Sequence, residues 1–172
     1  MMISMTQAFV TLTAVAGCLH DLHNRRIPNY VTFGSTALAI GYGLVNGGWQ
    51  GVGAAMAGWA LGIAVFVPFF LLRGMGAGDV KLLAALGAWI GPMALLSLTI
   101  YTALAGGVMA LLVVLWEKKL ETTFRNIWLL LCYWRVMGVK PLPELSLENQ
   151  NSPRLAYGVP IAVGAMLTIW LH

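Results

Sequence analysis

Two carboxylic acids, Asp21 and Asp79, are the residues of this sequence best suited to chemistry. Each stands at the edge of a long stretch without charged side chains, where an ionisable group is costly to bury and often marks a functional site. Two carboxyl groups held close together do not both ionise, because their like charges repel. Such a pair can hydrolyse an amide: the ionised group takes a proton from the attacking water, and the protonated group donates one to the carbonyl oxygen. We therefore ask whether the fold brings Asp21 and Asp79 together.

Each aspartate also has a purely structural interpretation, which the sequence leaves open. Asp79 ends the Gly-rich segment 74–79, for which we expect non-helical backbone, and it would also suit the N-cap of the next helix. Asp21 is expected at the C-terminal end of the first helix, and an interfacial charge there needs no chemical role. The helix dipole disfavours a carboxylate at that end, so a functional role would explain the cost. The dipole favours an ionised Asp79, and hence Asp79 as the base and Asp21 as the acid.

The chain that must position these carboxylates is strongly apolar. Of its 172 residues, 59% are hydrophobic and 9% are charged, with a mean hydropathy of +0.81 and a net charge of +4. Soluble domains usually contain about a quarter charged residues, so this composition excludes a water-soluble enzyme and a free nucleic-acid-binding protein. Cys18 and Cys132 form no CxxC pair and no disulfide framework. We predict an all-α polytopic membrane protein.

The charged side chains are grouped, and so are the stretches that lack them. The charges occupy three windows: 21–26, 73–81 and 117–154. The charge-free runs are 1–20, 30–72, 82–116 and 155–172. A spanning helix needs about 20 apolar residues, so these runs accommodate one, two, two and one spans, six transmembrane helices in all. The helix-breaking segments 46–50 and Gly91–Pro92 mark the turns inside the two middle runs.

Six spans would leave all three charged windows on one side of the membrane. The positive-inside rule makes that side cytoplasmic and puts both termini outside. Residues 1–20 could instead be a cleaved signal peptide, but basic residues follow this run and none precedes it, which favours a retained helix. The apolar segment 127–139 is too short to cross and is predicted to form an interfacial helix. We expect residues 1–172 to form a single membrane-embedded domain.

Two histidines beside Asp21 are the candidate metal ligands of the sequence. His20 and His23 would share one face of a continuous helix, as metal-binding histidines often do. No second cluster of ligand residues accompanies them, and an interfacial histidine needs no metal. The sequence also has no phosphate loop and no dinucleotide fingerprint. We expect no metal and no cofactor.

The residues around both aspartates resemble motifs of a known protein family. Gly76–Asp79, followed by Lys81, resembles the GxGD signature of intramembrane aspartyl proteases. Asp21, with Arg25 and the segment Ile27–Asn29 after it, is similar to the first-aspartate motif of the type IV prepilin peptidases.

The C-terminal region resembles a third motif of that family. Residues 157–164, Tyr-Gly-Val-Pro-Ile-Ala-Val-Gly, are similar to its PYG-x-x-I-x-x-G stretch. Ala156 stands where the family usually has proline, and Pro160 stands where a small helix former is more usual. The three motifs occur in the family's order and extend over almost the whole chain.

The resemblance implies an aspartic endopeptidase of the bacterial inner membrane that cleaves the leader peptide from prepilins at the cytoplasmic face. Asp21 and Asp79 would be catalytic, and the implied partners are prepilin substrates and membrane lipid, with no nucleic acid. Without an N-terminal CxxC domain, the chain is similar to the short, tight-adherence (Flp-type) peptidases, which lack methyltransferase activity. The oligomeric state stays open.

Several residues near the aspartates are expected to shape the site or to contact the substrate. The expected site-shaping residues are Gly76, Gly78, Lys81, Pro28 and Asn29. The basic residues Arg25, Arg26 and Arg73, and Lys81 with them, suit an acidic group of the substrate. Lipid headgroups would attract the same positive charges, so both interpretations stay open.

Two other classes of protein are compatible with the same aspartates. A small proton- or cation-coupled transporter would use Asp21 and Asp79 in an ion pathway, although transporters usually hold such groups near the midplane and contain repeats. A membrane scaffold would use them only to cap and orient helices. Replacing either aspartate with asparagine distinguishes the three classes. It should abolish cleavage by a peptidase, alter the ion flux of a transporter and leave the partner binding of a scaffold intact.

Overall fold

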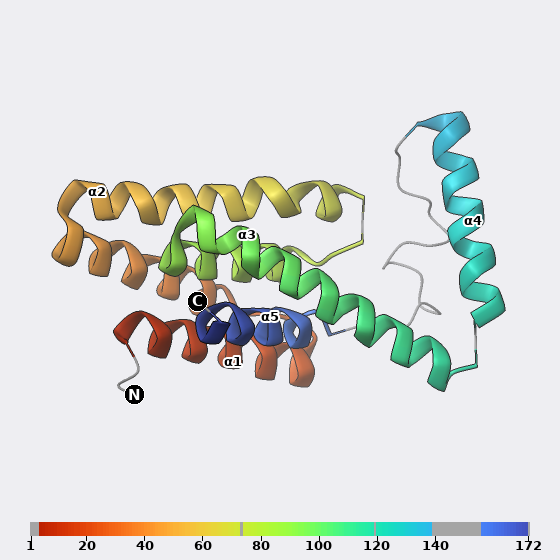
Figure 1. Cartoon of the computed structure of the whole chain (residues 1–172), viewed down its shortest axis with the longest axis horizontal. Coiled ribbons are helices and arrows are strands. Elements are labelled where there is room, and N and C mark those ends of the chain that lie inside the picture. The colour runs from red at the N-terminus through yellow and green to blue at the C-terminus, as the bar shows by residue number, and fades with distance from the viewer. Residues whose placement is uncertain (1–3, 73, 119, 139–155, 172) are drawn as a thin grey trace.

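The computed structural model of the chain describes residues 4–72, 74–118, 120–138 and 156–171, and the regular elements in that part are all helices. They are α1 Met5–Asn24, α2 Asn29–Leu71, α3 Ala77–Trp116, α4 Leu120–Met137 and α5 Gly158–Leu171. The predicted all-α class is therefore confirmed for the described residues. Figure 1 shows α1, α2, α3 and α5 packed together, with α4 standing apart from them.

The two longest helices are both long and apolar enough to cross a membrane. α2 has 43 residues and α3 has 40, and each is interrupted by one glycine with non-helical backbone. Gly48 has φ 56° and ψ −143°, and Gly91 has φ 76° and ψ 174°, regions that essentially only glycine adopts. In Figure 1 the two halves of α2, orange and yellow, therefore run side by side. The turns predicted within 46–50 and at Gly91–Pro92 are confirmed.

The first half of α3 is the centre of the bundle. The five consecutive residues 82–86 are fully buried, as expected for a helix that is apolar on every side and surrounded by others. α3 packs most extensively against α2, then against α5 and α1. Its approach to α2 is close because glycines face each other: a Cβ on Gly87 would lie 2.5 Å from the carbonyl oxygen of Gly58.

Polar side chains inside the bundle hold three helices together, while large apolar side chains cover its outside. Ser35 Oγ of α2 accepts a hydrogen bond from Trp89 Nε1 of α3 at 2.9 Å and lies 2.7 Å from Thr13 Oγ1 of α1. Trp49 and Met93, by contrast, are more than four-fifths exposed, at 84% and 81%. Exposed apolar surface on this scale indicates contact with lipid or with another protein.

α4 differs from the interfacial helix predicted over 127–139. It begins earlier, at Leu120, because residues 120–126 contain no helix breaker and Glu121 in the first turn complements the helix dipole. Residue 139 lies outside the described residues. Phe124 and Trp128 are exposed on α4, which among the described helices contacts little besides α3.

Candidate active site

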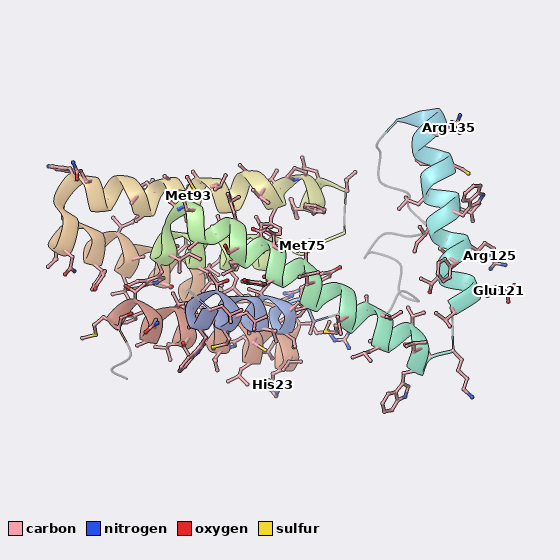
Figure 2. All side chains as sticks on the ribbon, in the orientation of Figure 1. His23, Met75, Met93, Glu121, Arg125 and Arg135 are labelled. Atoms are coloured by element: carbon pink, nitrogen blue, oxygen red, sulfur yellow. The ribbon has the colours of Figure 1, made fainter. Side chains whose placement is uncertain are left out.

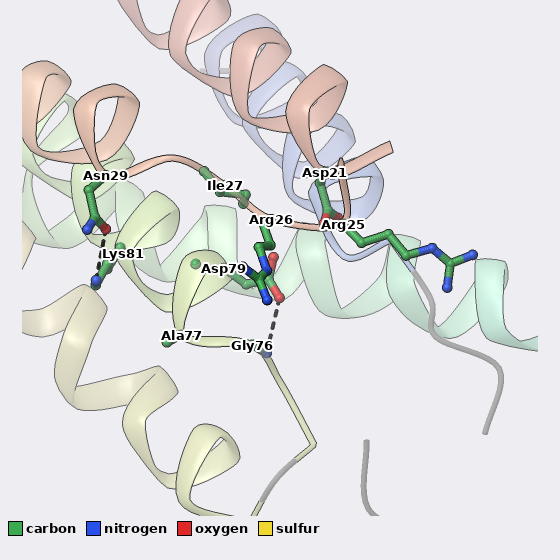
Figure 3. A pocket seen from close by; sticks show the side chains of 10 residues that line it. Asp21, Arg25, Arg26, Ile27, Asn29, Gly76, Ala77, Asp79 and Lys81 are labelled. Atoms are coloured by element: carbon green, nitrogen blue, oxygen red, sulfur yellow. Dashed lines mark hydrogen bonds between the residues drawn. The ribbon is translucent and has the colours of Figure 1, made fainter. Parts of the chain in front are cut away.

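The fold brings the two aspartates to one cavity of about 340 Å³. Asp21 comes from the last turn of α1 and Asp79 from the first turn of α3, two elements that are far apart in the sequence (Figure 3). Each carboxylic acid is only 8% exposed, and the two groups interact electrostatically. Two buried carboxyl groups at one cavity provide the arrangement that general acid–base hydrolysis needs.

Asp21 is held by the N-terminus of a helix that lies 137 residues further along the chain. The backbone N–H of Gly158, the first residue of α5, donates to Asp21 Oδ2 at 2.8 Å in a buried hydrogen bond. This helix start offsets the unfavourable position of Asp21 in the last turn of α1, because a helix N-terminus favours a carboxylate. A Cβ on residue 158 would lie 2.9 Å from Asp21 Cβ and 3.1 Å from Cys18 Cα, so only glycine leaves room for this contact.

Asp79 is held from its own helix. The backbone N–H of Gly76 donates to Asp79 Oδ2 at 3.2 Å, and Gly76 itself is the N-cap of α3. The expectation of non-helical backbone up to Asp79 is therefore wrong for its last residues: α3 begins at Ala77, since the Asp79 carboxylate satisfies an amide at the helix start. Asp79 is the third residue of α3 and not its N-cap. Gly78 packs against Ile27, and a Cβ there would lie 3.2 Å from Ile27 Cβ.

Predicted site-shaping residues join the start of α2 to the start of α3. Lys81 Nζ donates to Asn29 Oδ1 at 3.0 Å and lies 5.4 Å from the centre of the Phe33 ring, a cation–π contact. Asn29 and Lys81 both line the cavity, as Gly76 and Gly78 do. Pro28 is the N-cap of α2 and is not among the lining residues.

Of the three arginines predicted to contact substrate or lipid, two line the cavity and the third lies outside the described residues. Arg25 and Arg26 line the cavity beside the aspartates (Figure 3). Arg73 lies outside the described residues. The candidate metal ligand His20 instead has Nε2 3.1 Å from the Tyr30 hydroxyl, and the described residues contain no group of three His, Cys, Asp or Glu that could hold a metal.

Two residues at the site were not predicted to belong to it. Gly158 binds Asp21, and its neighbour Tyr157 is half-buried and interacts electrostatically with Asp79. The only signal for them was the motif resemblance of residues 157–164, which identifies a segment without saying what it contacts. Spacing could not provide that information, because the contact joins the two ends of the chain.

Comparisons with known proteins identify a family and several relatives. A model of the type IV leader peptidase family matches residues 8–111, a range that includes both aspartates. A prepilin leader peptidase/N-methyltransferase of Aeromonas hydrophila is 36% identical over 109 residues, which are 59% of this chain and 37% of that protein. The protein of the same name from Xanthomonas campestris pv. campestris is 31% identical over 105 residues, 57% of this chain and 36% of its own.

A third relative of that name, from Burkholderia pseudomallei, is 42% identical over 70 residues, 39% of this chain and 22% of its own length. The matched region thus spans little more than a third of even the better-covered relatives. No solved structure matches the chain.

Proposed function

Since the chain belongs to the type IV leader peptidase family, we propose that it is an intramembrane aspartyl endopeptidase that removes leader peptides from prepilin-like substrates. The observation that carries this proposal is the pair of buried carboxylic acids, Asp21 and Asp79, at one cavity. The names of the relatives support prepilins as the substrate class.

In the proposed mechanism the two carboxyl groups share one proton, so that one acts as the general base and the other as the general acid. The ionised carboxylate removes a proton from water, and the water oxygen attacks the peptide carbonyl carbon while the protonated carboxyl donates its proton to the carbonyl oxygen. When the tetrahedral intermediate collapses, the C–N bond breaks, the carboxyl that took the proton from water gives it to the leaving amine, and one hydroxyl of the intermediate returns its proton to the other carboxylate, which restores the pair. Oδ2 of each aspartate remains hydrogen-bonded to a backbone amide, that of Gly158 for Asp21 and that of Gly76 for Asp79. Oδ1 of each aspartate then exchanges protons with water and substrate.

We further propose that the site lies at the cytoplasmic edge of the bacterial inner membrane, inside one membrane-embedded domain. The interruptions at Gly48 and Gly91 would divide α2 and α3 into two spans each, and with α1 and α5 these make six. This arrangement puts the aspartates and the charged loops on one side, with both termini on the other. Arg25, Arg26 and Lys81 would then face the cytoplasm and contact an acidic group of the substrate or lipid headgroups.

Leader removal from a co-expressed prepilin tests the proposal. The wild-type chain should convert the precursor to the shorter mature form, and the Asp21→Asn and Asp79→Asn variants should accumulate the precursor although they reach the membrane in equal amounts. Cleavage at the wild-type rate by either variant would exclude the two-carboxylate mechanism. If the wild type cleaves no prepilin while the variants alter an ion flux, the same two residues serve a transporter.

A further inference from the structure

Arg25 has a backbone conformation that arginine rarely adopts. It is the C-cap of α1, with φ 51° and ψ 32°, in the left-handed region where a side chain crowds the backbone. Among the described residues five have a positive φ, and three of these are glycines, Gly48, Gly91 and Gly138; the other two are Arg25 and Lys118. The turn after α1 requires a left-handed residue, and glycine would occupy that position with less strain than arginine.

The end of the helix does not explain why this residue is an arginine. The bond that closes α1 runs from the backbone N–H of residue 25 to the carbonyl oxygen of Asp21, at 2.8 Å, and any residue except proline could donate it. The last turn of α1 already contains a basic residue, His23, that complements the helix dipole. Strained backbone positions are concentrated at functional sites. The role of residue 25 is therefore expected to lie in its side chain.

The Arg25 side chain belongs to the cavity that holds the aspartates but is not bound to them. Arg25 is exposed and lines this cavity together with Arg26 and Lys81. In Figure 3 the Arg25 side chain points away from Asp21 and Asp79, and no dashed line joins its guanidinium to another residue of the cavity. Lys81, by contrast, already donates to a side-chain oxygen and lies against an aromatic ring. The N–H groups of the Arg25 guanidinium are thus available to a bound molecule.

The lining of this cavity carries more positive than negative charge. Its three described cations accompany two carboxyl groups that share one proton in the proposed mechanism, so that two positive charges are not balanced. The other described acidic residues, Glu117 and Glu121, belong to the end of α3 and to α4, and Figure 2 shows Glu121 outside the bundle. A bound peptide displaces water from the cations, which is costly unless the peptide supplies an anion. The cavity therefore suits a peptide with an acidic side chain.

We propose that Arg25 is a specificity-determining residue that binds an acidic side chain of the peptide substrate near the cut, an inference that rests on the proposed peptidase function. The planar guanidinium offers two parallel N–H donors to a carboxylate, a geometry that a lysine ammonium does not have. Because Arg25 points away from Asp21 and Asp79, its positive charge is not held against the two carboxyl groups, where it would favour the ionised form of both. The chain thereby prefers peptides with an aspartate or glutamate beside the site of cleavage.

Two matched series of probes test this proposal. One series consists of prepilins from Aeromonas hydrophila, the source of one relative, that carry a single glutamate at successive positions beside the cut, and the other series carries glutamine at the same positions. We expect the wild-type chain to cleave a glutamate probe with a kcat/KM about ten-fold or more above that of its glutamine partner at one or more positions. Arg25→Gln should cleave both partners at the same rate, because losing either side of one contact removes the same interaction.

Arg25→Gly separates the role of the side chain from that of the turn. Glycine adopts the left-handed conformation readily, so this variant should unfold at or above the wild-type temperature although it loses the preference for glutamate. Lys118→Gly is the matched control, because it removes the same charge and the same backbone strain at a residue outside the cavity, and it should cleave both series as the wild type does. A lower unfolding temperature for Arg25→Gly would show that the arginine stabilises the turn, contrary to the proposal.

Three other results would contradict the proposal, each for a different reason. A preference for glutamate that persists in Arg25→Gln, or no preference in the wild type at any position, would overturn the role of Arg25 and leave the peptidase function intact. A loss that Arg25→Gln shows equally with both series, and only in vesicles that contain anionic phospholipid, would assign the guanidinium to a lipid headgroup. A wild type that cleaves neither series would overturn the peptidase function itself.

Discussion

Gly158→Ala is the substitution for which the structure gives the most definite expectation. The added Cβ would lie 2.9 Å from Asp21 Cβ and 3.1 Å from both Asp21 Oδ2 and Cys18 Cα. Contacts between such atoms are ordinarily 3.4 Å or longer, so α1 and α5 must separate by about 0.5 Å. The hydrogen bond from Gly158 N–H to Asp21 Oδ2, now 2.8 Å, would lengthen to about 3.3 Å, beyond the usual range for N–H···O.

The size of the effect on cleavage follows from this hydrogen bond. A hydrogen bond to a charged group contributes about 1.5–3 kcal/mol, and each 1.36 kcal/mol of barrier corresponds to a factor of about ten in rate. We therefore expect Gly158→Ala to cleave prepilin about 10- to 150-fold more slowly than the wild type. The rate is measured as the loss of precursor over time in membranes that contain equal amounts of each variant.

A matched control separates this local effect from a general effect of replacing a helical glycine. Gly53→Ala adds the same methyl group where nothing lies within 4 Å, so it should cleave at the wild-type rate. If Gly158→Ala also cleaves at the wild-type rate, the α5 amide does not position Asp21 for the reaction, and the reasoning is refuted.

Two further substitutions test the packing that holds the site together, each by thermal unfolding of the detergent-solubilised protein. Ser35→Ala leaves Trp89 Nε1–H without its acceptor and removes the contact with Thr13, so we expect a loss of about 1–3 kcal/mol; an unchanged midpoint would mean that this buried contact does not stabilise the bundle. Gly87→Val puts atoms where the Gly58 carbonyl oxygen now lies, so the α2–α3 contact must open and little folded protein should be recovered, whereas recovery at the wild-type level would contradict this close approach.

The sequence predicted much of the helical framework because the relevant signals are local. Charge-free runs marked the apolar helices, and the glycines at 48 and 91 lie where helix breakers were expected. The start of α4 was missed because most of residues 120–126 carry polar side chains that suit a helix as well as a loop, with only Leu120 and Phe124 apolar. The start of α3 was missed because the glycines before Asp79 suggested irregular backbone, whereas the Asp79 carboxylate binds the amide of Gly76 and stabilises the first turn.

Only part of the site was predictable, because the sequence carries local signals and some of the contacts at the site join distant residues. Asp21 and Asp79 were recognised by their own positions, and the six predicted spans put both of them on one side of the membrane. The partner of Asp21 was not predictable from spacing, since Gly158 lies 137 residues away and acts through its backbone, which leaves no mark in residue type except the absence of a side chain.

The central claim, that Asp21 and Asp79 act as one catalytic unit, is tested most directly by comparing single and double variants. Leader removal from purified prepilin is measured with the purified chain in lipid vesicles for the wild type, Asp21→Asn, Asp79→Asn and the double variant, and mass spectrometry identifies the new N-terminus of the product. We predict that each single variant loses nearly all activity and that the double variant is no slower than either one, because groups that share one proton fail together. Appreciable cleavage by one single variant, or losses that multiply in the double variant, would contradict the account.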